Sequence, residues 1–154
     1  MAKLPLATIR EVLNIVDSGG NGPEAMRRTQ ESLIGEILDE QDEPKGWDAA
    51  QELLDAEIAK RGWRIHKESG AYRMALRALA EIAQENLSPP SNHLAGYMDA
   101  ADKVGMTDIS KLQMATSGSD VVRRMALGTT LRGPLLDALV FLAQQHYGSK
   151  AQGN

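Results

Sequence analysis

The sequence contains no cysteine, few aromatic residues and no long apolar run. The absence of cysteine excludes disulfide bonds, thiolate zinc sites and thiol nucleophiles. Because only 4% of the residues are aromatic, the hydrophobic core must consist mainly of alanine, leucine and methionine, which favour helices. No stretch approaches the ~18 apolar residues of a membrane-spanning helix, and residues 1–6 lack the pattern of a signal peptide. We therefore expect a soluble, cytoplasmic protein that does not contact a membrane.

Motifs for catalysis and cofactor binding are also missing. The three histidines, His66, His93 and His146, lie on separate segments, and none belongs to an H-E-x-x-H or E-x-x-H motif. No serine stands in a G-x-S-x-G turn. The glycine-rich run at 19–22 follows a predicted helix and lacks the Lys-Ser/Thr pair of a phosphate-binding loop. The sequence therefore predicts no catalytic residue, no metal and no cofactor.

Strand signals are nearly absent, whereas helix starts and ends are frequent. The length of 154 residues is typical of one domain. We predict an all-α fold, a single-domain bundle of about six to eight helices over residues 1–148, with a polar tail over residues 149–154. The predicted helices cover residues 7–17, 23–39, 47–61, 71–86, 92–104, 107–114, 119–127 and 134–147.

Glycine and proline set most of the predicted helix ends. Gly62, Gly105 and Gly148 are each predicted to end a helix, and Pro134 to begin the last one. Segment 63–67 is predicted to be a turn whose Trp63 and Ile65 pack inward. The predicted apolar faces are Trp47, Ala50, Leu54 and Ile58 on one helix, and Tyr72, Ala75, Leu76, Leu79, Ile82 and Ala83 on the next.

Charge is distributed unevenly along the chain, although the net charge is only −4. Residues 1–59 carry 5 basic and 13 acidic side chains, a net charge of −8. Residues 60–77 carry 6 basic side chains and 1 acidic one, a net charge of +5. Residues 78–102 carry 4 acidic side chains and no basic one, and residues 103–154 carry 6 basic and 3 acidic ones. This polarity suits head-to-tail stacking or an anionic ligand, and it equally suits ordinary solvated helix faces.

The basic residues of the middle and late helices are the candidate functional residues. Arginine side chains match the geometry of phosphate oxygens, so such a set can bind a nucleic-acid backbone without reading its sequence. Since few aromatic residues accompany them, base stacking would contribute little. The alternative interpretation is a solvated surface. The candidate nucleic-acid-binding residues are Arg73, Arg77, Lys111, Arg123, Arg124 and Arg132.

Residues 13–37 roughly follow the apolar pattern of a helix-turn-helix motif. The second helix of that motif would carry Glu36, Asp39 and Glu40 and no basic residue, which does not suit a DNA groove. This interpretation nevertheless provides the alternative function, a DNA-binding protein such as a phage terminase small subunit.

The C-terminal stretch LLDALVFLAQQHYGSK, residues 135–150, resembles the closing helix of a known family. That family is the small subunit of class 1 CRISPR–Cas effector complexes, especially of type III. Residues 72–77, with the sequence YRMALR, are more loosely similar to its middle helix, which carries tyrosine and arginine. The acidic N-terminal third has no counterpart, as expected of a divergent branch such as type IV.

The resemblance implies an all-helical, non-catalytic subunit of a ribonucleoprotein. Members of the family stack along the complex, contact its backbone subunits and copies of themselves, and line a basic groove for RNA or single-stranded DNA. On this chain, the residues expected in that role are the six basic residues named above.

Overall fold

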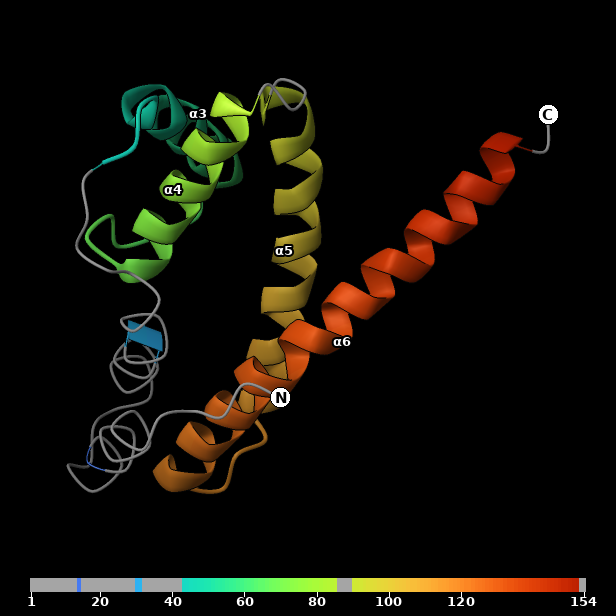
Figure 1. The fold of residues 1–154 in the computed structure, drawn as a ribbon. Coiled ribbons are helices and arrows are strands. Elements are labelled where there is room, and N and C mark those ends of the chain that lie inside the picture. The colour runs from blue at the N-terminus through green and yellow to red at the C-terminus, as the bar shows by residue number, and fades with distance from the viewer. Residues whose placement is uncertain (1–13, 15–29, 32–42, 86–89, 153–154) are drawn as a thin grey trace. The chain divides into compact units, whose positions relative to one another are not determined.

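The computed structural model describes residue 14 and residues 30–31, 43–85 and 90–152. It is all-α, and no strand occurs among these residues. The chain forms two compact units: residues 30–113, here called the core unit, and residues 1–29 with 114–154, here called the terminal unit. Residues 43–85 and 90–152 form four helices (Figure 1), which are α3 (Trp47–Arg61), α4 (Gly70–Gln84), α5 (Pro90–Leu112) and α6 (Gly118–Gln152).

Helix α3 has the bounds that the sequence predicted, because its end is fixed by local backbone geometry. Gly62 adopts a left-handed conformation with φ 64°, which glycine tolerates without strain. The N–H of Gly62 donates to the carbonyl of Ala59 at 3.1 Å, and the N–H of Trp63 donates to that of Ile58 at 3.2 Å. These two bonds form a Schellman motif, which satisfies carbonyls that the helix end leaves free.

Helix α4 begins where a serine side chain can cap it. The Oγ of Ser69 accepts a hydrogen bond from the backbone N–H of Tyr72 at 3.3 Å. The segment 63–67 before it is non-helical, as predicted, and Trp63 is half-buried. Ile65 is 38% exposed, so the prediction that its side chain packs inward is wrong.

The hydrophobic core of the core unit lies where α4 contacts both α3 and α5. The predicted faces of α3 and α4 are largely confirmed. At the end of α4, however, Ile82 and Ala83 are exposed, and Ala80, which was not predicted, is fully buried in the core. Leu76, near the middle of α4, is 1% exposed. The buried cluster consists of Ala50, Leu54, Tyr72, Leu76, Leu79, Ala80, Leu94 and Met98.

Helix α5 runs through the position where the sequence predicted a break. Gly105 was expected to end one helix, and a separate helix was predicted over residues 107–114, but α5 is continuous. The Thr107 hydroxyl donates to the carbonyl of Lys103, one turn earlier, at 2.8 Å, so it bonds back into the helix instead of capping a new one. Gly105 takes no positive φ here.

Helix α6 also replaces two predicted helices by one. It begins at Gly118. The Oγ of Ser117, just before the helix, accepts a hydrogen bond from the backbone N–H of Asp120 at 3.2 Å. It then continues through Pro134, although an internal proline removes one helical hydrogen bond. Gly148, predicted to end the last helix, lies inside α6, which reaches residue 152 and so includes most of the predicted polar tail.

Four helices therefore stand where six were predicted between residues 47 and 147. The predicted helices at 7–17 and 23–39 fall largely outside the described residues, of which Asn14, Gln30 and Glu31 are helical. Whereas the sequence predicted one bundle over residues 1–148, the structure groups the chain into the two units defined above.

The buried position of Leu76 generates a stability prediction. Leu76→Ala should lower the free energy of unfolding of the core unit by about 2–5 kcal/mol, because it leaves a cavity among α3, α4 and α5. Chemical denaturation followed by circular dichroism measures the change. Met74→Ala on the same helix is the matched control, because Met74 is 39% exposed and its loss should cost far less. Equal costs for the two variants would contradict the described packing.

Candidate nucleic-acid interface

The candidate basic residues of the core unit lie on α4 and α5. Arg73 and Arg77 are one turn apart on α4, as their spacing predicted; Arg73 is exposed and Arg77 is half-buried. Lys111 is exposed in the last turn of α5. Of these three residues, Arg73 and Lys111 present their charge to solvent.

The other three candidate residues lie on α6, in the terminal unit. Arg123 and Arg124 are exposed near the start of the helix, and Arg132 is half-buried. The Nε of Arg124 donates to the Oδ2 of Asp120 at 2.8 Å. This bond, ahead of smaller contributions, holds the pKa of Asp120 below its ordinary value of 3.8. Arg124 is thus partly neutralised, whereas Arg123 stands exposed beside it.

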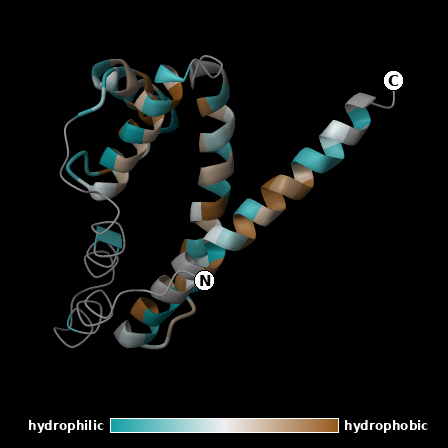
Figure 2. Cartoon of the chain, in the orientation of Figure 1, coloured by the Kyte–Doolittle hydropathy of each residue, from teal (hydrophilic) through white to brown (hydrophobic). Residues whose placement is uncertain are grey.

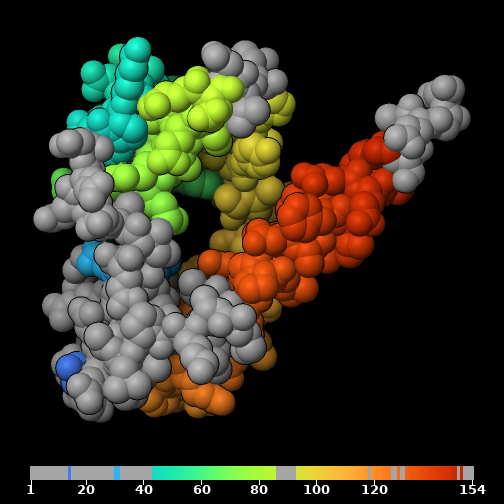
Figure 3. Space-filling view, in the orientation of Figure 1, coloured from blue at the N-terminus to red at the C-terminus, as the bar shows by residue number. Residues whose placement is uncertain are grey.

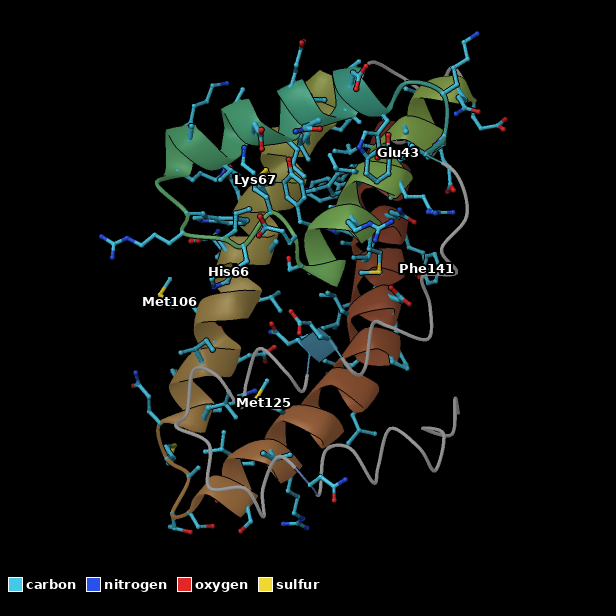
Figure 4. The ribbon with its side chains drawn as sticks, turned by 90° about the vertical axis from the view of Figure 1, so that its left-hand side faces the viewer. Glu43, His66, Lys67, Met106, Met125 and Phe141 are labelled. Atoms are coloured by element: carbon cyan, nitrogen blue, oxygen red, sulfur yellow. The ribbon has the colours of Figure 1, made fainter. Side chains whose placement is uncertain are left out.

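The basic run at 60–67, which precedes Arg73 and Arg77 in the chain, is largely engaged with carboxylates. The Nζ of Lys60 is 2.5 Å from the Oε1 of Glu57, and the Nζ of Lys67 is 2.6 Å from the Oδ2 of Asp55. Lys67, labelled in Figure 4, lies in the segment between α3 and α4. The net charge of +5 over residues 60–77 is therefore offset in space by acidic residues of α3.

Arg61 is the most heavily bonded of these basic residues, and its side chain is only 17% exposed. One guanidinium nitrogen donates to the Oε2 of Glu57. The residue Glu57 is itself buried, with 7% of its surface exposed. The other guanidinium nitrogen donates to the carbonyl of Ala95 at 2.9 Å and to the Oδ1 of Asp99 at 2.7 Å. The end of α3 is thereby fastened to the first half of α5.

These contacts shift the ionisation of both partners toward the charged forms. The hydrogen bonds from Lys60 and then Arg61 lower the pKa of Glu57 below 4.5. The hydrogen bonds to Asp99 and then Glu57 raise the pKa of Arg61. The spacing of Glu57 and Arg61, four residues apart on a helix, was a sequence signal for this pair. Nothing in the sequence indicated Asp99.

A second polar cluster joins α3 to α4. The hydroxyl of Tyr72 donates to the Oδ1 of Asp55 at 2.8 Å, and Lys67 binds the other oxygen of the same carboxylate. The bonds from Lys67 and then Tyr72 lower the pKa of Asp55. Burial, together with the bond to Asp55, raises the pKa of Tyr72 to about 12. The cluster lets a buried tyrosine satisfy its hydroxyl and fixes α4 against α3.

A pocket of about 330 Å³ opens in the core unit beside this network. It is lined by Arg61, Trp63, Asp99, Asp102 and Lys103. Its acidic groups are already engaged, because Asp99 binds Arg61 and the Nε1 of Trp63 donates to the Oδ1 of Asp102 at 3.0 Å. Four of the five lining side chains thus bind one another, and Lys103 is exposed at the fifth position.

Neither metal binding nor a membrane span is indicated by the described residues. Among them, no three histidine, aspartate or glutamate side chains gather in a way that could hold a metal ion. His66 and His93 are exposed, and the His146 ring lies edge-on to the Tyr147 ring at a centroid distance of 5.2 Å. No helix in the described part of the chain combines the length and apolarity that crossing a membrane requires.

Helix α6 displays the largest apolar surface in the described part of the terminal unit. Figure 2 shows hydrophobic residues through the middle of its C-terminal half, and Figure 3 shows that half open to view on one face. In the N-terminal half, by contrast, Val122 is 2% and Met125 is 7% exposed. The large exposed apolar residues of α6 are Leu131, Leu135, Leu136, Leu139, Val140, Phe141, Leu142 and Tyr147.

The chain was compared with protein-family models, with curated protein sequences and with solved structures, and it matches none of them. The alternative function, a helix-turn-helix DNA binder, depends on residues 13–37, of which the structure describes only Asn14, Gln30 and Glu31. The described residues that carry a functional argument are therefore the exposed arginines and the apolar half of α6.

The Asp55–Tyr72 bond generates a pH prediction. Because the pKa of Tyr72 is about 12 in the folded protein and 10.0 is its ordinary value, the neutral phenol stabilises the fold. This contribution is complete below pH 10 and is lost as the pH rises toward 12. In a Tyr97→Phe, Tyr147→Phe variant, where Tyr72 is the last tyrosine, the ultraviolet absorbance of tyrosinate should titrate with a midpoint near 12.

Asp55→Asn in the same background is the control. It removes the acceptor charge but leaves Tyr72 buried, so the titration midpoint should fall and still exceed 10.0. A midpoint at 10.0 in the folded protein that retains Asp55 would show that Tyr72 is not bonded as described.

Proposed function

We propose that this protein is a non-catalytic structural subunit of a nucleoprotein assembly, which docks through α6 and contacts phosphates through its arginines. The observation that carries the proposal is the exposure of the apolar C-terminal half of α6. A helix without a partner on such a surface is typical of a protein–protein interface, because apolar surface gains free energy when it leaves water.

The size of this surface supports docking. A buried leucine side chain removes on the order of 100 Å² of apolar surface from water. Eight large side chains that are 38–68% exposed therefore present roughly 400–500 Å². Single exposed apolar residues are common on any protein, but a contiguous area of this size on one helix is within the range of functional patches.

The more specific form of the proposal is a small subunit of a class 1 CRISPR–Cas effector complex. Residues 135–148, which make up most of the stretch that resembles that family, are all exposed on α6. In this role the protein would work in the cytoplasm, bind the backbone subunits of the effector and contact RNA or single-stranded DNA. The proposal assigns it no catalytic residue and no cofactor.

Phosphate contacts are assigned to the basic residues that solvent reaches. Arg73 on α4 and Arg123 on α6 are both exposed, and arginine forks bind phosphate oxygens in a bidentate manner. Arg124, which shares its charge with Asp120, would contribute less. Such binding would be independent of sequence and would weaken steeply with salt.

Co-purification tests the assembly role. When the tagged chain is expressed together with the products of its neighbouring genes, it should elute in a high-mass particle that contains nucleic acid. The measurement is size-exclusion chromatography with absorbance at protein and nucleic-acid wavelengths, followed by sequencing of the bound strand. Elution of the tagged chain alone and free of nucleic acid would count decisively against the proposal.

Charge reversal tests the phosphate contacts. Arg123→Glu combined with Arg124→Glu should weaken binding of single-stranded RNA. It should also reduce the slope of log affinity against log salt by about 0.7 to 1.4, since a full contact contributes about 0.7 and Arg124 contributes less than a full one. Fluorescence anisotropy at several salt concentrations measures both quantities. The matched control is Arg64→Glu with Lys103→Glu, which changes the net charge equally at exposed residues outside the candidate set. Equal losses in both variants would indicate net charge, not this site.

A further inference from the structure

We propose that the pocket between the end of α3 and α5 binds a guanine nucleotide, stacked on Trp63 and held by Asp102 and Lys103. This inference deepens the proposed contact with nucleic acid, and the choice of a nucleotide over another small ligand rests on that function. It is derived from the volume of the pocket, from its aromatic lining and from two charged groups that the fold leaves without a counter-charge.

The pocket has the size of a small-molecule site. Its volume of about 330 Å³ lies at the lower end of the roughly 300–1,000 Å³ that ligand pockets occupy. All of its lining residues belong to the core unit, and the pocket is partly open to solvent. A pocket of this size accepts one flat ring system, while its open side leaves room for the sugar and the phosphate.

The indole of Trp63 supplies the stacking surface. Trp63 is half-buried and packs against the hydrophobic cluster of the core unit. Its Nε1 donates to the Oδ1 of Asp102 at 3.0 Å, which fixes the ring against α5. A ring fixed in this way is already organised for binding, because little conformational entropy is lost when a base stacks on it. Stacking accepts any base, so the choice among bases must come from the polar groups of the pocket.

The carboxylate of Asp102 is the group that can select the base. Among the described residues, the Nε1 of Trp63 donates to it and no cation pairs with it. The neighbouring Asp99 differs, because Arg61 balances its charge at 2.7 Å. Since a carboxylate offers about four lone-pair sites, Asp102 can accept two further N–H groups from a ligand.

Guanine is the base that matches this carboxylate. Its Watson–Crick edge carries two adjacent donors, the N1–H and the N2 amino group, which fit the two oxygens of a carboxylate. Adenine and cytosine place an unprotonated ring nitrogen beside their amino group, and uracil flanks its one N–H with two carbonyls. These acceptors would lie against the carboxylate and weaken binding. We therefore expect GMP to bind about tenfold more tightly than AMP.

Lys103 supplies the contact to the phosphate. It follows Asp102 in the chain, lines the pocket and is exposed, and it forms no ion pair with a described residue. A lysine ammonium is a common ligand of phosphate. The same charge disfavours an arginine or lysine side chain of a protein partner, because like charges would then lie close together. The ligand must therefore carry donors at one end and an anionic group at the other.

Calorimetric titration of the unmodified chain with GMP, AMP, CMP and UMP tests the selectivity, and GMP should bind most tightly. Asp102→Asn keeps an oxygen for the Nε1 of Trp63 but presents an amide N–H₂ group to the base, so the roughly tenfold preference for GMP over AMP should largely disappear. Equal affinity for the four nucleotides, or an unchanged preference in Asp102→Asn, would overturn the proposal.

The phosphate contact is tested in the same titration. Lys103→Gln should weaken GMP and AMP alike, by about fivefold or more, because a charge-assisted bond is lost. Lys45→Gln is the matched control, since Lys45 is an exposed lysine of the core unit that does not line the pocket. Equal losses in the two variants would show that Lys103 does not hold the phosphate.

Tryptophan fluorescence tests the stacking. In a Trp47→Phe variant, Trp63 is the last tryptophan, so quenching of its emission by GMP reports a base on its ring. Circular dichroism and an unchanged calorimetric affinity show that this variant is folded and binds normally. Binding of GMP without quenching would overturn the proposed position of the base.

Two RNA strands distinguish a free nucleotide from a guanine within a chain. Oligouridine with one central guanine should bind more tightly than oligouridine if the pocket accepts a strand, and Asp102→Asn should remove the difference. A preference confined to GMP would assign the pocket to the free nucleotide. Oligouridine is also the strand for the charge-reversal comparison described above, because it leaves the pocket empty and so keeps Arg64→Glu with Lys103→Glu a control for net charge.

The two proposals fail in different ways. A chain that binds GMP through Asp102 but never co-purifies with nucleic acid would remove the proposed function and leave the pocket assignment intact. A chain that enters a nucleic-acid-containing particle but binds the four nucleotides equally would overturn the pocket assignment and leave the proposed function in place. An arginine-containing peptide that binds the pocket when GMP does not would also overturn the assignment and indicate a protein ligand.

Discussion

Arg61 links α3 to α5 in the core unit through a set of polar bonds. The apolar cluster is shared mainly between α3 and α4, and α5 contributes to it with Leu94 and Met98. The guanidinium of Arg61, at the end of α3, binds the buried Glu57 on its own helix and reaches α5 at the Ala95 carbonyl and Asp99. Two basic partners, Lys60 and Arg61, balance the charge of the buried Glu57, and Arg61 also links α3 to α5.

The same network explains why the most basic stretch of the sequence is a poor candidate for binding phosphate. Lys60, Arg61 and Lys67 have carboxylate partners within the core unit. Arg61 links α3 to α5, Lys67 ties the segment before α4 to α3, and Lys60 pairs within α3. The basic side chains left to solvent, such as Arg73 and Arg123, lie further along the chain. The formal charge of a sequence segment therefore overstates how much unpaired positive charge that segment presents to solvent.

Local signals in the sequence predicted local structure well. The bounds of α3 followed from Gly62, and the buried positions of α4 followed from the spacing of Tyr72, Leu76 and Leu79. The prediction of helix ends failed at residues that occur both at helix ends and inside helices. Gly105, Pro134 and Gly148 are frequent at helix ends, yet each lies inside a helix here. Whether a glycine ends a helix depends on whether its backbone turns left-handed, and its neighbours in sequence do not determine that.

The candidate site was predictable only as a set of residue types. The one-turn spacing of Arg73 and Arg77 was evident from sequence, whereas the bond between Arg124 and Asp120 depends on where α6 begins. The exposure of the C-terminal half of α6 could not be predicted from the sequence, because leucine-rich helices are usually buried. Long-range partners such as Asp99 for Arg61 require the fold itself.

The exposed apolar surface of α6 has a consequence for the cell that synthesises this protein. Copies that have not found their partner present the kind of surface that chaperones and proteases recognise, and at high concentration they join non-specifically. Synthesis of such a chain in excess of its partners would be wasteful and would promote aggregation. In the proposed assembly, the exposed half of α6 would therefore tie the abundance of this protein to that of its partners, because unassembled chains would be removed and assembled ones would persist.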